Sequence, residues 1–198
     1  MPTSMLLKRL GIFIINDFIQ ASECASLCHE MHAADTTQAE ILKESLHTEC
    51  LDEKIRQTQY CQISDSAQNS INQRLMNLKP ALERHFQTPL ADDFEHAKFL
   101  KYNKGDFFSP HTDAQYQRKI NITINLNSAQ SATSELGFTG GELRLYGLIQ
   151  QAGFANKGIA APAHAGCLIA YPVDIVHEVT PITQGKRLSI VSRFLSKA

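Results

Sequence analysis

His111 and Asp113 are separated by one residue in the stretch that follows Pro110. In an extended segment, residues i and i+2 point to the same side, so this imidazole and carboxylate could hold one metal ion from adjacent corners. A second histidine from a distant strand would complete a 2-His-1-carboxylate face and leave the opposite coordination positions open. A His-x-Asp pair also arises by chance, and a surface turn after Pro110 explains it equally well in isolation.

The missing histidine could be His177, which lies near the end of an apolar run and before a turn that contains Pro181 and Gly185. Arg187 opens the strand that follows, and we expect a hairpin to bring it near the depth of His177. A buried arginine needs an anionic partner, because an unpaired charge in a dry site is costly. A dicarboxylate cosubstrate would supply that partner through a bidentate pair. A solvated strand arginine is the alternative.

These residues and their surroundings resemble the prolyl 4-hydroxylase-like branch of the Fe(II)/2-oxoglutarate-dependent dioxygenase superfamily. Residues 102–110 are similar to its Tyr-x-x-Gly-x-x-x-x-Pro pattern, and residues 140–143 to its Gly-Gly-Glu-Leu strand start. Residues 166–172 are similar to its Gly-Asp-Leu-x-x-Phe/Tyr-Pro stretch, although Cys167 replaces the aspartate. The resemblance covers about residues 99–194, half of the chain.

The resemblance implies that His111, Asp113 and His177 bind Fe(II) and form the catalytic centre. It also implies that Arg187 binds the distal carboxylate of 2-oxoglutarate and that Tyr102 lies near this cosubstrate. O2 is then the co-reactant, with ascorbate as an optional further cofactor. Because Asp113 is present, the halogenase variant, in which a halide takes the place of the carboxylate, is disfavoured.

The segment 120–127 alternates between apolar and polar residues. Its isoleucines share one face with Leu126, whereas Asn121, Thr123 and Asn125 share the other. A polar face inside a β domain indicates a lined pocket, and a solvent-facing sheet surface is the alternative. We therefore add Thr123 and Asn125 to the candidate cofactor-binding residues.

Arg193 follows Arg187 by six residues, a spacing similar to the paired arginines of AlkB-type nucleic-acid demethylases. That branch has a longer gap between the distal histidine and the first arginine, and this chain has no basic stripe. We therefore do not expect a nucleic-acid partner, and we assign Arg193 to the substrate side of the site.

The expected function is hydroxylation of a C–H bond, in a peptidyl proline or another protein residue, with release of succinate and CO2. Alternatives are a small-molecule hydroxylase of the same superfamily, an AlkB-type demethylase, and a cupin-type oxygenase that does not use 2-oxoglutarate. A catalytically silent jelly-roll module that has kept its metal site is the non-enzymatic alternative. Loops 128–140 and 150–165 are candidates for substrate specificity.

The elements that must position these residues read as strands in the second half of the chain, near residues 95–102, 120–126, 143–148, 168–171 and 188–194. The first half has a short strand at 11–15 and helices at 22–34 and 65–85. The pattern predicts a mainly β protein with flanking helices. By resemblance the fold is a double-stranded β-helix, a cupin-like jelly roll. We expect one domain over 1–198, with 1–90 as support and 91–198 as the catalytic core.

Composition limits the setting. The chain has 198 residues and a formal net charge of -1, so no global positive field attracts nucleic acid or an anionic membrane. Five cysteines without regular spacing do not suggest a disulfide framework, and no segment reads as a membrane span or signal peptide. We expect a cytoplasmic protein of undetermined oligomeric state. Cys24, Cys28 and His32 follow helical spacing, and core packing explains them better than a second metal site.

Overall fold

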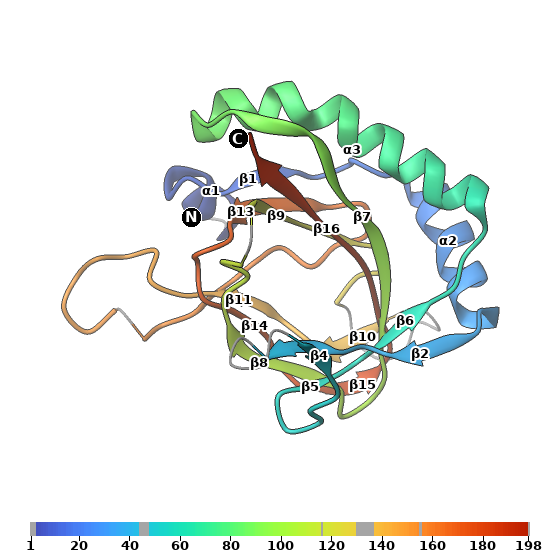
Figure 1. Ribbon diagram of the computed structural model, residues 1–198. Helices are drawn as coiled ribbons and strands as arrows, with labels where there is room; N and C mark the ends of the chain where they lie inside the picture. The colour runs from blue at the N-terminus through green and yellow to red at the C-terminus, as the bar shows by residue number, and fades with distance from the viewer. Residues whose placement is uncertain (1–2, 44–47, 116, 130–136, 155, 198) are drawn as a thin grey trace.

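Two antiparallel β-sheets face each other in the computed structural model, and helices cover the outer surface of the larger sheet (Figure 1). The structure describes residues 3–43, 48–115, 117–129, 137–154 and 156–197. The predicted mainly β jelly roll with flanking helices is confirmed. Among the described residues, no helix is long and apolar enough to cross a bilayer.

Within the described residues, the larger sheet has the strand order β1-β13-β9-β16-β7-β6-β2. Its strands are β1 (Phe13–Ile15), β2 (Thr36–Gln38), β6 (Gln59–Cys61), β7 (Leu90–Tyr102), β9 (Arg118–Asn125), β13 (Leu168–Pro172) and β16 (Arg187–Ser196). The alternation predicted for β9 is confirmed, because Ile120, Ile122 and Ile124 belong to the core beneath the helices. The polar side chains of the same strand are also buried, so they face the space between the sheets.

The smaller sheet has the order β12-β11-β14-β8-β5 within the same residues. Its strands are β5 (Arg56–Gln57), β8 (Phe107–His111), β11 (Leu143–Leu145), β12 (Ile159–Ala160) and β14 (His177–Val179). Two further pairs lie outside the main sheets, β10 (Phe138–Gly140) with β15 (Ile182–Gly185) and β3 (Ile41–Lys43) with β4 (Thr48–Cys50).

The helices α2 (Ala21–Ala33) and α3 (Asp65–Phe86) pack on the larger sheet from outside (Figure 1). The helix predicted at 65–85 is confirmed as α3, and Ile71, Leu75 and Leu82 form a fully buried apolar stripe along it. Burial of each such side chain contributes about 1.5–3 kcal/mol, so this stripe holds the helix on the sheet. A further short helix, α1 (Thr3–Arg9), was not anticipated from the sequence.

The predicted hairpin between His177 and Arg187 is wrong. Strand β14, which carries His177, belongs to the smaller sheet, whereas β16, which begins at Arg187, belongs to the larger one. The chain crosses between the sheets through β15, which pairs with β10 instead of β14. The two side chains therefore approach the same space from opposite walls.

The glycine pair at 140–141 allows the chain to pack closely where it crosses between the sheets. Both residues have positive φ angles, of 72° and 62°. A Cβ atom on Gly140 would lie 2.2 Å from the carbonyl oxygen of Pro181, and one on Gly141 would lie 3.2 Å from Cδ of Arg187. The Gly-Gly motif is thus required by backbone conformation and by the close approach of β15 and Arg187.

The two candidate specificity loops are only partly described. Residues 130–136 of the first and residue 155 of the second lie outside the described residues. Strand β10 belongs to the first loop, and β12 to the second.

On helix α2, Cys24 and Cys28 are buried in the core, while His32 is exposed. These three side chains do not share one environment, which favours packing over metal binding for the cysteines.

Candidate active site

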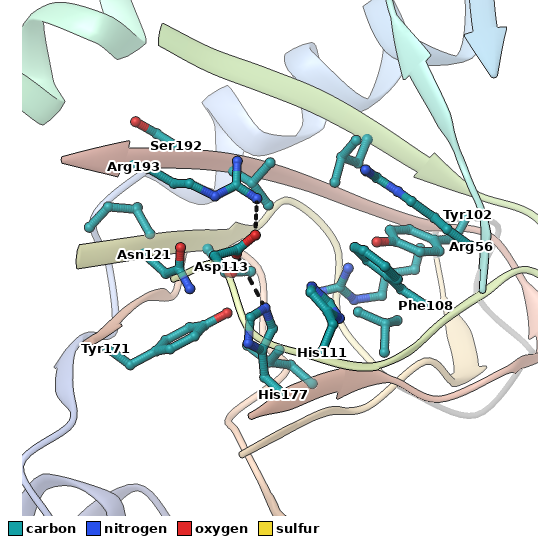
Figure 2. A pocket seen from close by; sticks show the side chains of 17 residues that line it. Arg56, Tyr102, Phe108, His111, Asp113, Asn121, Tyr171, His177, Ser192 and Arg193 are labelled. Atoms are coloured by element: carbon teal, nitrogen blue, oxygen red, sulfur yellow. Dashed lines mark hydrogen bonds and ion pairs between the residues drawn. The ribbon is translucent and has the colours of Figure 1, made fainter. Parts of the chain in front are cut away.

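The two histidines of the candidate metal site are direct neighbours across the smaller sheet. Strands β8 and β14 are paired so that His111 lies opposite His177. Asp113 follows β8, and its backbone N–H donates to the carbonyl of Val173 at 2.9 Å. Figure 2 shows the three side chains pointing toward one another, with Oδ2 of Asp113 3.5 Å from Nε2 of His177.

The hydrogen bonds of the two histidines set which nitrogen is free. Nδ1 of His111 lies 2.8 Å from the carbonyl oxygen of Ser109, and Nδ1 of His177 lies 3.0 Å from that of Ile175. A carbonyl oxygen only accepts, so each Nδ1 donates and each ring presents Nε2 to the cavity. Fixing the ring through its outer nitrogen is the usual arrangement for a metal-ligating histidine.

The electrostatics keep the donors in the forms that a metal requires. Burial, followed by the neighbouring His177 ring, lowers the pKa of His111 from about 6.5 to about 3. Burial would raise the pKa of Asp113, but its contact with His177 and the charge of Arg193 outweigh that effect, and the pKa lies well below its usual range. The site therefore contains a neutral imidazole beside a carboxylate anion at neutral pH.

This donor set fits an Fe(II) ion. One ligand atom from each of His111, Asp113 and His177 lies within 4.8 Å of the others, so small side-chain rotations bring all three onto one ion. Two nitrogens and one carboxylate oxygen on one face match the facial triad of non-haem iron. Among the described residues, this is the cluster of His, Cys, Asp and Glu in which three donors can share an ion.

Arg187 lines the same cavity as the triad. Its side chain is buried, and its guanidinium donates from Nη1 to Oγ of Ser189 at 2.9 Å and from Nη2 to Oδ1 of Asn125 at 3.0 Å. The Nε atom has no hydrogen-bond partner. Within the described part of the chain, its hydrogen-bond partners are neutral, so its charge is not balanced there.

Tyr102 and Thr123 both line the cavity, as predicted for residues near a cosubstrate. Tyr102 is paired with Arg187 across strands β7 and β16, and its ring centroid lies 5.4 Å from the guanidinium carbon. Asn125 stands behind Arg187 and orients it, and Nδ2 of Asn125 donates to the carbonyl of Pro162 at 2.9 Å. Direct contacts of these three residues with a cosubstrate stay predictions.

Arg193 has a different environment from the one expected of a simple substrate contact. Its Nη2 donates to Oδ1 of Asp113 at 3.0 Å (Figure 2), and its Nη1 donates to Oε2 of Glu95 at 3.2 Å. Glu95 also accepts from Nε of Arg118. Arg193 lines the cavity as well, so its substrate role stays a prediction, but its clearest action is to hold one carboxylate oxygen of Asp113 and leave Oδ2 free.

Several cavity residues were not assigned from the sequence. Asn121 is buried and neither of its amide atoms has a hydrogen-bond partner among the described residues, and the alternation of β9 already placed it on the polar face. Tyr171 is fully buried, lies edge-on to His177 with ring centroids 5.0 Å apart, and ends the motif at 166–172. Arg56 and Glu95 come from outside any strong motif, and only the fold brings them to the site.

The fold and this donor set together define a jelly-roll protein with a facial-triad metal site. The family model for the 2OG-Fe(II) oxygenase superfamily matches residues 97–194, which include the triad, Arg187 and Arg193. The chain belongs to this superfamily, whose cofactor is Fe(II) and whose cosubstrate is 2-oxoglutarate.

Curated relatives include the PKHD-type hydroxylase YbiX of Shigella boydii, with 27% identity over 135 residues. The aligned part is 68% of this chain and 54% of that relative, and YbiX of Escherichia coli matches to the same extent. The chain therefore spans about half the length of the curated relatives it matches.

Solved structures establish the fold independently. A prolyl-4-hydroxylase from Pseudomonas putida has a TM-score of 0.71 and 22% identity, with 99% of this chain and 100% of that chain covered. A prolyl hydroxylase from Trichoplax adhaerens, in complex with a hypoxia inducible factor peptide fragment, has a TM-score of 0.71 and 16% identity, with 98% and 87% covered. At these identities the likeness shows a shared fold.

Proposed function

We propose that this chain is an Fe(II)- and 2-oxoglutarate-dependent oxygenase that hydroxylates a C–H bond and releases succinate and CO2. One observation carries the proposal. Arg187, a buried arginine with no anionic partner among the described residues, borders the same cavity as three metal donors. A metal ion and a cation at two ends of one cavity are suited to a dicarboxylate that chelates the metal through one end.

The protein's own residues would act mainly by positioning. His111, Asp113 and His177 would hold the ion, and bound Fe(II) with 2-oxoglutarate would supply the activation of O2 and the oxidation of the C–H bond. Arg187 would bind the distal carboxylate, held in its orientation by Asn125. The buried ring of Tyr171 would keep bulk water from the metal side of the cavity.

The substrate that we favour is a peptidyl proline or another protein residue. Prolyl hydroxylases share the fold, and one of them is named for its complex with a peptide fragment. A small-molecule substrate is the second candidate, because an epimerase from nogalamycin biosynthesis, SnoN, also shares the fold with a TM-score of 0.65. A cytoplasmic location belongs to the same proposal, supported by five free cysteines.

Anaerobic titration of the chain with Fe(II) and 2-oxoglutarate tests the proposal. We expect a weak visible absorption band from the metal–oxoacid chelate, absent in His111→Ala and present in His96→Ala, whose histidine is exposed on β7. After O2 is admitted, wild type should form succinate. A missing band together with no succinate would refute the oxygenase proposal and favour a silent metal-binding module.

The Arg187→Ala variant distinguishes the proposed function from a cupin-type oxygenase that does not use 2-oxoglutarate. If the chain oxidises its substrate without 2-oxoglutarate, Arg187→Ala should leave turnover intact. Our proposal predicts that this variant needs a much higher 2-oxoglutarate concentration for the same succinate rate, because the charged partner of the distal carboxylate is gone.

A further inference from the structure

The arginines that line the site fall into two groups by their partners. We call the cavity that contains the triad and Arg187 the inner cavity. The outer cavity shares part of this lining and adds Glu40, Tyr60, Lys98 and Arg118. Four arginines border one or both cavities: Arg56, Arg118, Arg187 and Arg193. Arg118 and Arg193 form ion pairs with Glu95 and Asp113. Arg187 and Arg56 form none within the described residues. Arg187 faces the cosubstrate end, which leaves Arg56 as a second cation without an assigned anion.

Arg56 is held in place by groups that carry no charge. It is only 7% exposed, and its guanidinium carbon lies 4.7 Å from the ring centroid of Phe108, which itself stacks on His111. Nη1 donates to the carbonyl of Glu40 at 2.9 Å and reaches the hydroxyl of Tyr60 at 3.4 Å. Its buried Nε has no hydrogen-bond partner, and the described residues supply none for Nη2.

The position of Arg56 is at the border between the two cavities. It lines both of them, together with Phe108, His111 and Asp113. Figure 2 shows its side chain reaching past Phe108 toward the space in front of the triad. An anion on Arg56 would therefore lie beside the metal donors, on the side that opens into the outer cavity.

The outer cavity, of about 190 Å³, has a second cation that forms no ion pair within the described residues. Lys98 is exposed on β7, and its Nζ lies 5.1 Å from the ring centroid of Tyr60, while the guanidinium carbon of Arg56 lies 5.4 Å from the same centroid. Glu40 also lines this cavity. Arg56 and Lys98 thus hold two positive charges beside one aromatic ring in the lining of the same cavity, which favours an anionic occupant.

We propose that Arg56, assisted by Lys98, binds a carboxylate of the prime substrate, which makes an acidic residue close to the oxidised position a requirement for recognition. The identity of the occupant as a hydroxylation substrate rests on the proposed function; the carboxylate preference does not. Within that function, 2-oxoglutarate would have its charges balanced by Arg187 and by the metal, so Arg56 is left for another anion. A buried guanidinium with free N–H groups is suited to a carboxylate.

The test uses the full chain loaded with Mn(II) and 2-oxoglutarate, so that no turnover occurs. The probes are fluorescein-labelled octapeptide pools with Glu fixed at one position, and matched pools with Gln there. Fluorescence anisotropy at low salt should give about tenfold tighter binding of Glu pools at one or two positions. This preference should fall below about twofold in Arg56→Gln, persist in part in Arg56→Lys, and be unchanged in Arg74→Gln, whose arginine pairs with Glu23 far from the cavity.

Equal binding of the Glu and Gln pools by the wild-type chain would overturn the proposal. The exception is a result in which N-acetylglutamate binds, N-acetylglutamine does not, and the binding depends on Arg56. That outcome would support carboxylate recognition and assign it to a small acid. A preference that survives in Arg56→Gln would overturn it. So would a tenfold loss of 2-oxoglutarate affinity in Arg56→Gln without peptide, because Arg56 would then serve the cosubstrate.

Repeating the anisotropy series with Mn(II) but without 2-oxoglutarate separates the proposed carboxylate site from the proposed oxygenase function. A chain that fails to bind 2-oxoglutarate but keeps its Glu preference would contradict the oxygenase function and leave the carboxylate site standing.

Discussion

Arg187 and Arg193 lie six residues apart on the same strand and line one cavity, the first buried and the second mostly buried, but their partners are opposite in kind. Arg193 contacts two carboxylates, those of Asp113 and Glu95. Arg187 contacts the hydroxyl of Ser189 and the amide oxygen of Asn125. A buried cation paired with anions has its charge balanced within the protein, whereas one held by neutral dipoles has a binding role still to fill.

The difference follows from what each end of the cavity must do. At the metal site, the cation of Arg193 holds one carboxylate oxygen of Asp113 while the other oxygen stays available for the metal. At the inner end, an internal carboxylate would compete with the cosubstrate for Arg187. Neutral partners orient the guanidinium without satisfying its charge. Arg56 resembles Arg187 in this respect, because its partners are also neutral and its charge is suited to a ligand anion.

The largest effect is expected from Arg193→Met. Removing this cation leaves the buried carboxylate of Asp113 with less compensation, which should lower the free energy of unfolding of the metal-free chain by about 3 kcal/mol. Urea denaturation measures the loss, and Arg74→Met is the control with an ion pair on the surface. The double variant Arg193→Met/Glu95→Gln should recover part of it. A loss no larger than that of the control would show that Arg193 is not an internal counter-ion.

Metal binding provides a second test of the difference between the two arginines. Mn(II) at about 100 times its Kd should raise the free energy of unfolding by about 2.7 kcal/mol, since it binds the folded chain. Because the ion is itself a counter-charge for Asp113, it should bind the Arg193→Met variant more tightly, so at the same Mn(II) concentration this variant should gain more stability than wild type. Thermal unfolding with and without Mn(II) provides the measurement. His177→Ala, which lacks a donor, should gain little, and an equal gain there would place the ion elsewhere.

Arg187→Gln should affect binding instead of stability. Loss of a charge-assisted pair costs about 2 kcal/mol, so the affinity for 2-oxoglutarate should fall roughly 30-fold, as measured by calorimetry with Mn(II) present. The free energy of unfolding should change much less than in Arg193→Met, because no internal carboxylate loses its partner. If the two variants are equally destabilised, the distinction between these arginines does not hold.

The smallest effect is expected at the surface pair of Arg144 and Glu142, whose side chains are 43% and 44% exposed. Exposed ion pairs contribute about 0–1 kcal/mol, so Arg144→Gln should shift the unfolding midpoint only slightly. Urea denaturation beside Arg193→Met gives a direct measure of how much burial matters for an arginine–carboxylate contact. A loss as large as that of Arg193→Met would mean that burial is not the deciding factor.

Much of the site could be predicted because its residues carry local signals. His111 and Asp113 are two residues apart, and the Gly-Gly, Gly166 and Pro172 motifs occur in a recognisable order. The alternation of residues 120–127 also correctly separated the core face from the cavity face. Such patterns are readable because strand periodicity and turn geometry depend on neighbours in the chain.

The contacts that decide the charge of the site could not be read in this way. Glu95 pairs with both Arg118 and Arg193 only because β7, β16 and β9 are neighbours in the larger sheet. The predicted hairpin failed for the same reason, since the sequence does not indicate that the chain changes sheets at β15. Arg56 reaches the triad because β5 adds to the edge of the smaller sheet beside β8.

By itself, the sequence determined the donor types, their order and the strand pattern that carries them, because these depend on residue chemistry and local periodicity. Only the tertiary structure decided which arginines are neutralised and which remain without an anion. That distinction depends on distances between side chains far apart in the chain, and a sequence contains charges but not the separations that pair them.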